Sequence, residues 1–211
     1  MSLIQKNDVR NVTIIGAAVG LLVQPVITNT LMEIERATGL SESVLRIACF
    51  FGFLLLAPLA LWVASVLGKF LPVIYQFAKF AAVGSLNSFM NLGVFNLETL
   101  LVSQNPTKFV FGIFASVAWL TSATNSYFWN KYWTFDKREK PNSAEVILFY
   151  AITIGSWLLS VGVSTLVYSA KDLGFTSPAV WTNVVSPIAG FLTAFIWNFL
   201  GYKFFVFRKN T

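Results

Sequence analysis

Long apolar stretches alternate with short polar ones along the whole of this 211-residue chain. A helix of about 20 mostly apolar residues crosses a membrane, because about 30 Å of hydrocarbon is spanned at about 1.5 Å per residue. Six windows are long and apolar enough, at residues 12–31, 47–67, 77–102, 109–133, 146–168 and 179–205. The pattern therefore predicts an all-α fold, a polytopic transmembrane helix bundle of about six spans.

The composition agrees with a membrane protein and offers little for catalysis. Hydrophobic residues make up 56% of the chain and charged residues 11%, whereas a soluble domain carries about 25% charge. The chain has no His and a single Cys, Cys49, so the commonest general base and metal ligand is missing and no intramolecular disulfide can form. Asp136, Glu139 and Glu145 are interpreted as solvated loop charges. We therefore expect a protein that is not an enzyme and that uses no metal or cofactor.

The basic residues are distributed unequally between the two sets of connections. Arg36, Arg46, Lys108 and Lys171 fall on one side of the predicted membrane, and the other eleven of the 15 Lys and Arg residues fall on the side of the N-terminus. Because basic loops are retained in the cytoplasm, we expect a multi-pass protein of the cell (inner or plasma) membrane with both termini cytoplasmic. No segment is long enough for an exposed basic domain, so no nucleic-acid partner is expected.

One motif occurs twice, 72 positions apart, as "KYWTFDK" at residues 131–137 and "KFFVFRK" at residues 203–209. The alignment pairs Lys131 with Lys203 and Phe135 with Phe207. Each copy closes a pair of predicted spans, so the repeating unit is a helical hairpin, at about 77–137 and 146–209. A duplicated pair of spans keeps its orientation, and the last four spans are predicted to form two parallel-related hairpins. Transport would then proceed without an internal inverted repeat, for example in a homo-oligomer.

Three stretches resemble the GtrA-like family of four-span membrane proteins: "FAKFAAVGSLNSFMNLGVF" (77–95), "NSYFWNKYWTF" (125–135) and "WNFLGYKFFVF" (197–207). The family opens with Arg/Lys-Phe-x-x-x-Gly-x-x-Asn, which is matched by Lys79, Phe80, Gly84 and Asn87. It ends each hairpin with Asn-Arg-x-Trp-x-Phe, which is matched by Asn130, Lys131, Trp133 and Phe135. The second hairpin keeps Lys203, Phe205 and Phe207, after the pair Asn198-Phe199.

The chain departs from the family pattern in three ways. Lysines stand at 131 and 203 where the motif has arginine, and lysine holds a phosphate as a point charge without a bidentate fork. Tyr202 stands where Asn is usual. Residues 1–70 form an N-terminal extension with two probable transmembrane helices, ahead of a four-helix GtrA-like domain at 71–211.

The resemblance implies translocation, or flipping, of a polyprenyl-phosphate-linked sugar, or of its polyprenyl phosphate carrier, for cell-envelope polysaccharide synthesis. It also implies a membrane-associated glycosyltransferase as partner. The residues expected to bind phosphate are Lys79, Lys131 and Lys203. Those expected to contact the sugar or lipid are Asn87, Asn91, Asn130, Asn198, Trp129, Trp133, Trp197 and Tyr202.

The same residue types have ordinary roles in membrane proteins, which leaves an alternative open. Aromatic and basic residues at span ends anchor helices at the interface, and asparagines inside spans hold helices together. The alternative is a non-transporting anchor that recruits a glycosyltransferase and presents the lipid phosphate to it. A transporter needs a polar path that crosses the middle of the membrane, whereas an anchor needs only an interfacial site.

Overall fold

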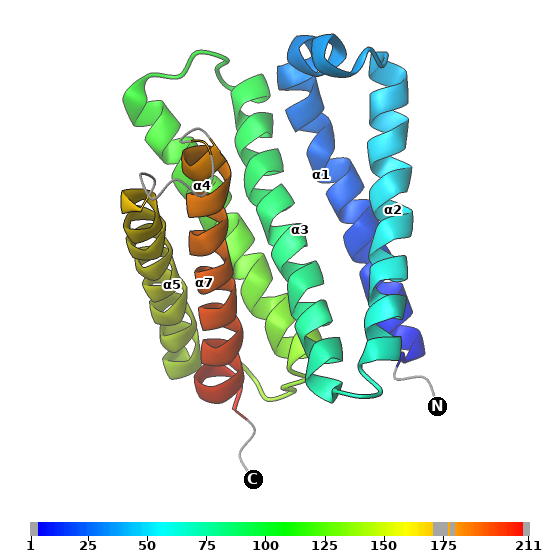
Figure 1. Cartoon of the computed structure of the whole chain (residues 1–211), viewed down its shortest axis with the longest axis vertical. Coiled ribbons are helices and arrows are strands. Elements are labelled where there is room, and N and C mark those ends of the chain that lie inside the picture. The colour runs from blue at the N-terminus through cyan, green and yellow to red at the C-terminus, as the bar shows by residue number, and fades with distance from the viewer. Residues whose placement is uncertain (1–3, 171–176, 178–179, 209–211) are drawn as a thin grey trace. The chain divides into compact units, whose positions relative to one another are not determined.

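In the computed structural model of this protein, which describes residues 4–170, 177 and 180–208, the regular structure is helical (Figure 1). The long helices are α1 (Lys6–Thr38), α2 (Glu42–Leu67), α3 (Pro72–Leu101), α4 (Lys108–Trp129), α5 (Ser143–Ser169) and α7 (Ser186–Gly201). Three π-helical turns extend them: η1 (Asn130–Thr134), η3 (Trp181–Val185) and η4 (Tyr202–Val206). The prediction of an all-α polytopic bundle is confirmed. The first residue of its last window, 179, and the last residue of the second motif, 209, lie outside the described residues.

Within the described ranges, five helices are long and apolar enough to cross a membrane. They are Lys6–Thr38, Glu42–Leu67, Lys108–Thr134, Ser143–Ser169 and Trp181–Val206, three of which correspond to a helix alone and two to a helix joined to its π-helical turns. The remaining predicted span, at 77–102, forms α3, which has 30 residues. Its sequence is less apolar because Asn87, Asn91 and Asn96 lie inside it. Helix α3 is therefore absent from the helices that are apolar enough along one continuous stretch to count as spans.

Local sequence signals set several helix ends. The side chain of Thr107 accepts a hydrogen bond from the backbone N–H of Val110 at the start of α4, and that of Asn142 accepts one from Glu145 at the start of α5. Such N-caps satisfy donors that a helix leaves unpaired in its first turn. Helix α1 ends at Gly39, whose φ of 69° lies in the left-handed region that glycine adopts without strain.

The chain forms two compact units, Met1–Asp136 and Lys137–Thr211, called here the N-terminal and the C-terminal unit. In the N-terminal unit α1 packs against α2 and α3, and α3 packs against α4 and η1. A buried apolar core holds these helices together, and it consists of Val12, Ile15, Val19, Leu61, Tyr75, Val83, Leu86 and Trp133. The two N-terminal helices therefore share a core with the first hairpin.

Glycines allow the helices of the N-terminal unit to approach closely. A Cβ atom on Gly16 of α1 would lie 2.5 Å from the carbonyl oxygen of Phe53 in α2. A Cβ atom on Gly93 of α3 would lie 2.5 Å from the carbonyl oxygen of Leu22 in α1. Both separations are too short for any side chain, as expected where membrane helices pack through small residues.

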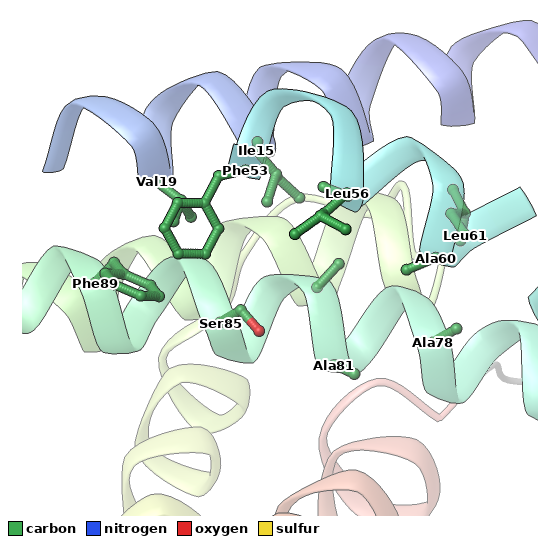
Figure 2. Close-up of a pocket in the computed structure, with 13 residues that line it drawn as sticks. Ile15, Val19, Phe53, Leu56, Ala60, Leu61, Ala78, Ala81, Ser85 and Phe89 are labelled. Atoms are coloured by element: carbon green, nitrogen blue, oxygen red, sulfur yellow. The ribbon is translucent and has the colours of Figure 1, made fainter. Parts of the chain in front are cut away.

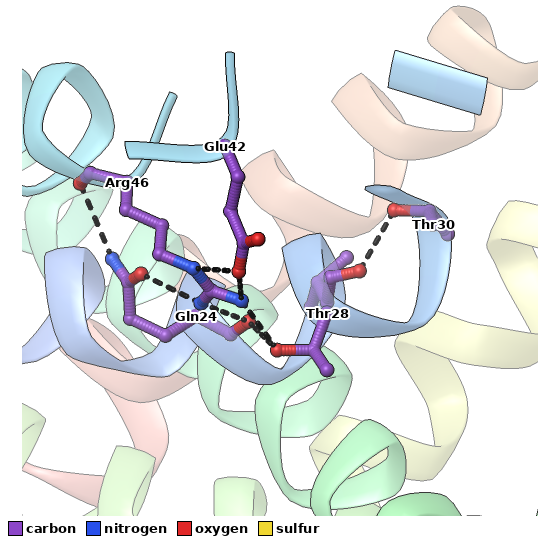
Figure 3. Close-up of polar contacts among 6 residues, drawn as sticks. Gln24, Thr28, Thr30, Glu42 and Arg46 are labelled. Carbon is purple, nitrogen blue, oxygen red and sulfur yellow. Dashed lines mark hydrogen bonds and ion pairs between the residues drawn. The ribbon is translucent and has the colours of Figure 1, made fainter. Parts of the chain in front are cut away.

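A polar network ties α1 to α2 near the α1–α2 connection (Figure 3). The guanidinium of Arg46 pairs with Glu42 at 2.8 Å and donates to Thr28 Oγ1 at 2.9 Å. It also donates to the side-chain oxygen of Gln24 at 3.3 Å. The polar second half of the first predicted span, which contains Gln24 and Thr28, is thus satisfied by a cation from the neighbouring helix.

In the C-terminal unit α5 packs against α7 and its π-helical turns. The interpretation of Glu145 as a solvated charge is wrong, because its side chain is buried and pairs with Lys137 at 2.9 Å. The Asn142 cap holds Glu145 in the first turn of α5, where the helix dipole favours an acid. Lys137 also donates to the carbonyl of Val206 at 3.4 Å, so one cation links the start of α5 to η4.

Candidate functional site

The repeated motif adopts the same backbone conformation in both units. In η1 the N–H of Phe135 donates to the carbonyl of Asn130 at 2.9 Å, and in η4 the N–H of Phe207 donates to the carbonyl of Tyr202 at 2.8 Å. The donors and the acceptors are the residues that the sequence repeat pairs. Each hairpin thus closes with one π-helical turn, a feature that is rare and frequently found at functional sites.

The two motif lysines also have equivalent surroundings. The ammonium of Lys131 lies 5.9 Å from the ring centroids of both Tyr127 and Tyr132. That of Lys203 lies 5.5 Å from the ring of Phe199 and 5.7 Å from that of Phe204. Each cation therefore contacts the ring four positions before it and the ring one position after it. Cation–π attraction explains why aromatic residues surround both lysines.

The burial of the two lysines differs. Lys131 is fully buried and Lys203 is half-buried. Since they belong to different units, the convergence of both lysines on one phosphate stays a prediction.

Lys79, the third predicted phosphate ligand, lies in a buried polar cluster that includes an acid. Its ammonium pairs with Asp8 Oδ1 at 2.6 Å, and the indole N–H of Trp133 donates to the same oxygen at 2.8 Å. The hydroxyl of Tyr75 donates to Asp8 Oδ2 at 2.8 Å. These residues, Asp8, Tyr75, Lys79 and Trp133, are called the Asp8 cluster.

The Asp8 cluster is held together from three elements. Asp8 comes from the first turn of α1, Tyr75 and Lys79 from the first turns of α3, and Trp133 from η1. The ammonium of Lys79 also lies 5.0 Å from the centroid of the Tyr75 ring and 5.6 Å from that of Trp133. The carboxylate of Asp8 is 3% exposed, so it depends on these donors in place of water.

An open groove lies halfway along the first hairpin, and it is called here the polar groove because four of its five lining residues are polar. It has a volume of about 420 Å³ and is lined by Asn87, Ser88, Asn91, Leu92 and Ser122. Asn87 accepts a hydrogen bond from the side-chain amide of Asn125 at 2.8 Å, which links α3 to α4. The groove thus brings the predicted residues Asn87 and Asn91 together.

A stripe of polar residues on α4 continues from this groove toward Lys131. Ser122, Ser126 and Asn130 are spaced by four residues and therefore share one face of the helix. The amide of Asn130 donates to the hydroxyl of Ser126 at 3.1 Å and to its carbonyl at 3.0 Å. The side-chain oxygen of Asn130 is buried without a hydrogen-bond partner. The stripe covers about 12 Å, at 1.5 Å per residue.

The remaining predicted sugar or lipid contacts are less favourably placed for a sugar. Trp133 and Tyr202 are buried, so neither ring presents an open face. Trp197 is 45% exposed and its N–H donates to the carbonyl of Ile152 at 3.2 Å. Trp129 is half-buried and contacts the edge of Trp133. The side-chain oxygen of Asn198 is buried without a partner.

An apolar groove of about 320 Å³ lies between α1, α2 and α3. Figure 2 shows Ile15 and Val19 of α1, Phe53 of α2 and Phe89 of α3 around it. Among the described residues that line it, Ser85 is the only polar one. Its chemistry suits a hydrocarbon chain.

Two members of the Asp8 cluster, Asp8 and Tyr75, are absent from the residues predicted from the sequence. The available signal was the position of Asp8, an acid at the third residue of a long apolar helix, since an acid within or beside a span is rarely without a partner. The partners themselves were not predictable, because Tyr75 and Trp133 are 67 and 125 positions away along the chain.

Comparison with known proteins shows what this arrangement is similar to. A family model described as "GtrA/DPMS, transmembrane domain" matches residues 79–207. The "Uncharacterized membrane protein YngA" of Bacillus subtilis (strain 168) is 27% identical over 133 residues, which cover 63% of this chain and 79% of that protein. No solved structure matches. Lys79, Trp133 and both π-helical turns lie inside the matched range, whereas Asp8 and Tyr75 lie outside it.

Proposed function

Because the chain belongs to the GtrA/DPMS transmembrane-domain family, we propose that it translocates a polyprenyl-phosphate-linked sugar, or the polyprenyl phosphate carrier, across the cell membrane. Family membership indicates a membrane function related to polyprenyl-phosphate sugars. The translocation step is our addition to that indication. In the proposal both termini face the cytoplasm, and a membrane-associated glycosyltransferase supplies or uses the lipid-linked sugar.

The observation that carries the proposal is the polar groove halfway along the first hairpin. Asn87 and Asn91 lie near the middle of α3, and Ser122 lies near the middle of the segment formed by α4 and η1. Polar groups in the middle of spans are costly in lipid and mark pathways for polar substrates. An anchor that works only at the interface has no need of them.

The two motif lysines are assigned to the phosphate. Each stands at the end of its hairpin in the same π-helical turn, the level at which a lipid phosphate lies if that end is interfacial. The stripe of Ser122, Ser126 and Asn130 leads from the groove to Lys131, so a headgroup that leaves Lys131 meets hydrogen-bonding partners on its way to the groove.

One observation favours the alternative, a non-transporting anchor that presents the lipid phosphate to a glycosyltransferase. Trp133 and Tyr202 are buried and offer no open ring on which a sugar ring can stack. A protein that binds the phosphate and leaves the sugar to its partner requires no such platform.

A reconstituted flipping assay separates the two functions. The protein is placed in vesicles with a fluorescent polyprenyl-phosphate sugar analogue, and movement of the headgroup between leaflets is followed by quenching. We expect flipping by the wild type, loss of most activity in Asn87→Leu, Asn91→Leu, and loss of binding in Lys131→Ala, Lys203→Ala. Lys108→Ala, an exposed lysine outside the motifs, is the matched control. Binding without flipping by the wild type would favour the anchor, and no preference over phosphatidylcholine would reject both functions.

A further inference from the structure

The hydrogen-bond donors of the Asp8 cluster form a binding site for one anion. Asp8 Oδ1 accepts from Lys79 and Trp133, and Oδ2 accepts from Tyr75 and, at 3.3 Å, from the backbone N–H of Gln5. Each carboxylate oxygen therefore receives two hydrogen bonds. An ammonium, a phenol hydroxyl and an indole N–H aimed at one point would hold the oxygens of a phosphate equally well.

The carboxylate in this anion-binding site and the side chains that surround it come from different parts of the chain. Lys79 and Trp133 belong to the family-matched hairpin and Tyr75 precedes it by four residues, whereas Asp8 belongs to the N-terminal extension. Without Asp8, the first hairpin would present a cation and two neutral donors with no anion among them. The carboxylate thus stands where a ligand of the hairpin would bind.

Asp8 is also placed where it can leave while the core residues that α1 contributes from Val12 onward stay packed. In the first turn of α1 the neighbouring residues Lys6, Asn7, Val9 and Arg10 are exposed, and Asp8 alone points inward. The next buried residue is Val12. Helix ends open at low cost compared with the core, so this turn can unwind while α1 stays packed from Val12 onward.

We propose that Tyr75, Lys79 and Trp133 form a further binding site for the phosphate of a lipid headgroup, in addition to the two motif lysines, and that Asp8 occupies this site until the phosphate displaces it. Two like charges cannot share the site, so the phosphate enters as the carboxylate swings out with the first turn of α1. The proposal rests on the proposed function, because it concerns the capture of the same phospholipid-like substrate. In this proposal the N-terminal extension has a role in binding, because its Asp8 occupies the site until the substrate displaces it.

Binding of undecaprenyl monophosphate in phosphatidylcholine nanodiscs tests the proposal. In Asp8→Asn the competing charge is gone while the side-chain shape remains, and we expect binding at least about tenfold tighter than in wild type, since a tethered competitor acts at a high effective concentration. Adding Lys79→Gln or Tyr75→Phe to Asp8→Asn should reverse the gain. Glu42→Gln, which removes the same charge from the Arg46 network, is the matched control and should bind like wild type.

Two further arms identify the ligand chemistry. Uncharged undecaprenol should bind neither protein, and inorganic phosphate should not compete with the lipid. If inorganic phosphate displaces the bound lipid, the site belongs to free phosphate and the lipid proposal is overturned. If the lipid binds wild type and Asp8→Asn equally, Asp8 is not an occupant and the inference fails while the proposed function stands. If it binds neither, both fail.

Hydrogen exchange on the wild type provides a test that needs no variant. Addition of undecaprenyl monophosphate should speed exchange of the amides at Asp8–Arg10, because that turn unwinds when Asp8 is displaced and the amides of Asp8 and Val9 then lose their bond to the Gln5 carbonyl. The amides at Glu42–Arg46 serve as the internal reference. Unchanged or slower exchange at Asp8–Arg10 would overturn the proposal, even if Asp8→Asn fails to fold.

Discussion

Two buried acids of this apolar chain, one in each unit, are each paired with a lysine of their own unit. Asp8 pairs with Lys79 at 2.6 Å, and Glu145 pairs with Lys137 at 2.9 Å. A buried charge costs several kcal/mol unless it is paired and hydrogen-bonded, so each acid is useful only together with its cation. Removing one member of such a pair should therefore be worse than removing both.

The Asp8–Lys79 pair tests this at the level of stability. Lys79→Met removes the cation from the Asp8 carboxylate, which then stays unpaired or leaves with the first turn of α1, and we expect the free energy of unfolding to fall by about 1–3 kcal/mol. The double variant Asp8→Asn, Lys79→Met should recover a large part of that loss. The stability of both variants is measured by thermal unfolding in detergent, with size-exclusion chromatography as the readout of folded protein. If the loss of stability in the double variant equals the sum of the losses in Asp8→Asn and Lys79→Met, the two side chains do not interact.

Trp133 contributes to the same cluster through one hydrogen bond. Trp133→Phe keeps an aromatic ring but removes the N–H that donates to Asp8 at 2.8 Å. Because a buried charged acceptor loses a partner, we expect a loss of about 1–3 kcal/mol in unfolding free energy. Trp62→Phe is the control, since Trp62 is 57% exposed, and it should leave the unfolding temperature unchanged. Equal effects of the two substitutions would contradict the role of the indole N–H.

At the scale of elements, two helices begin in the same way. Asp8 is the third residue of α1 and Glu145 is the third residue of α5, a position where the helix dipole favours an acid. In both helices the acid also reaches a lysine outside the helix, Lys79 or Lys137. The acid thus serves its own helix and binds that helix to the rest of its unit.

Close helix contact is the second feature at this scale, and it gives a prediction with a built-in control. Gly16→Ala places a Cβ 2.5 Å from the carbonyl of Phe53, so α1 and α2 must separate at a cost of about 1–3 kcal/mol. Gly52→Ala is the matched control, because nothing lies within 4 Å of the added carbon and alanine favours the helix by up to about 1 kcal/mol. Thermal unfolding should fall for the first and stay or rise for the second. The opposite order would show that α1 and α2 do not pack as described.

The elements were predictable from the sequence to a greater extent than their contacts. Apolar windows marked the helices because lipid requires about 20 apolar residues whatever the tertiary structure, and the repeat paired Asn130 with Tyr202 at the two π-helical turns. The interpretation of Glu145 as solvated was wrong, because loop composition does not show that Lys137 folds back on it. Asp8 was missed for the same reason, since its partners lie in α3 and η1. The sequence pattern indicates which face of a single helix is buried. It does not indicate which side chains of different elements meet, because those pairs depend on how the elements pack.

At the scale of the whole molecule, the N-terminal helices are part of the fold of the first hairpin. Val12, Ile15 and Val19 of α1 share one core with Val83 and Leu86 of α3, and the Asp8 cluster joins the same elements. The division of the chain into an extension at 1–70 and a GtrA-like domain at 71–211 stays a prediction about sequence relationship. Physically, the first hairpin buries Val83, Leu86 and Trp133 in a core that it shares with the extension.

Expression of the chain as two fragments tests this dependence. Residues 71–211 alone should give little monodisperse protein, because α3 then exposes the surface that α1 covers in the intact chain. Co-expression with residues 1–70 should restore a complex, since the cut falls at the exposed Phe70 and Leu71 and leaves the core intact. Asp8→Asn in the short fragment should weaken the complex, and Glu42→Gln should not, because only Asp8 contacts the second fragment through Tyr75, Lys79 and Trp133. A stable, monodisperse fragment of residues 71–211 would show that the extension is dispensable for folding, and any effect of Asp8 on lipid binding would then be separable from assembly.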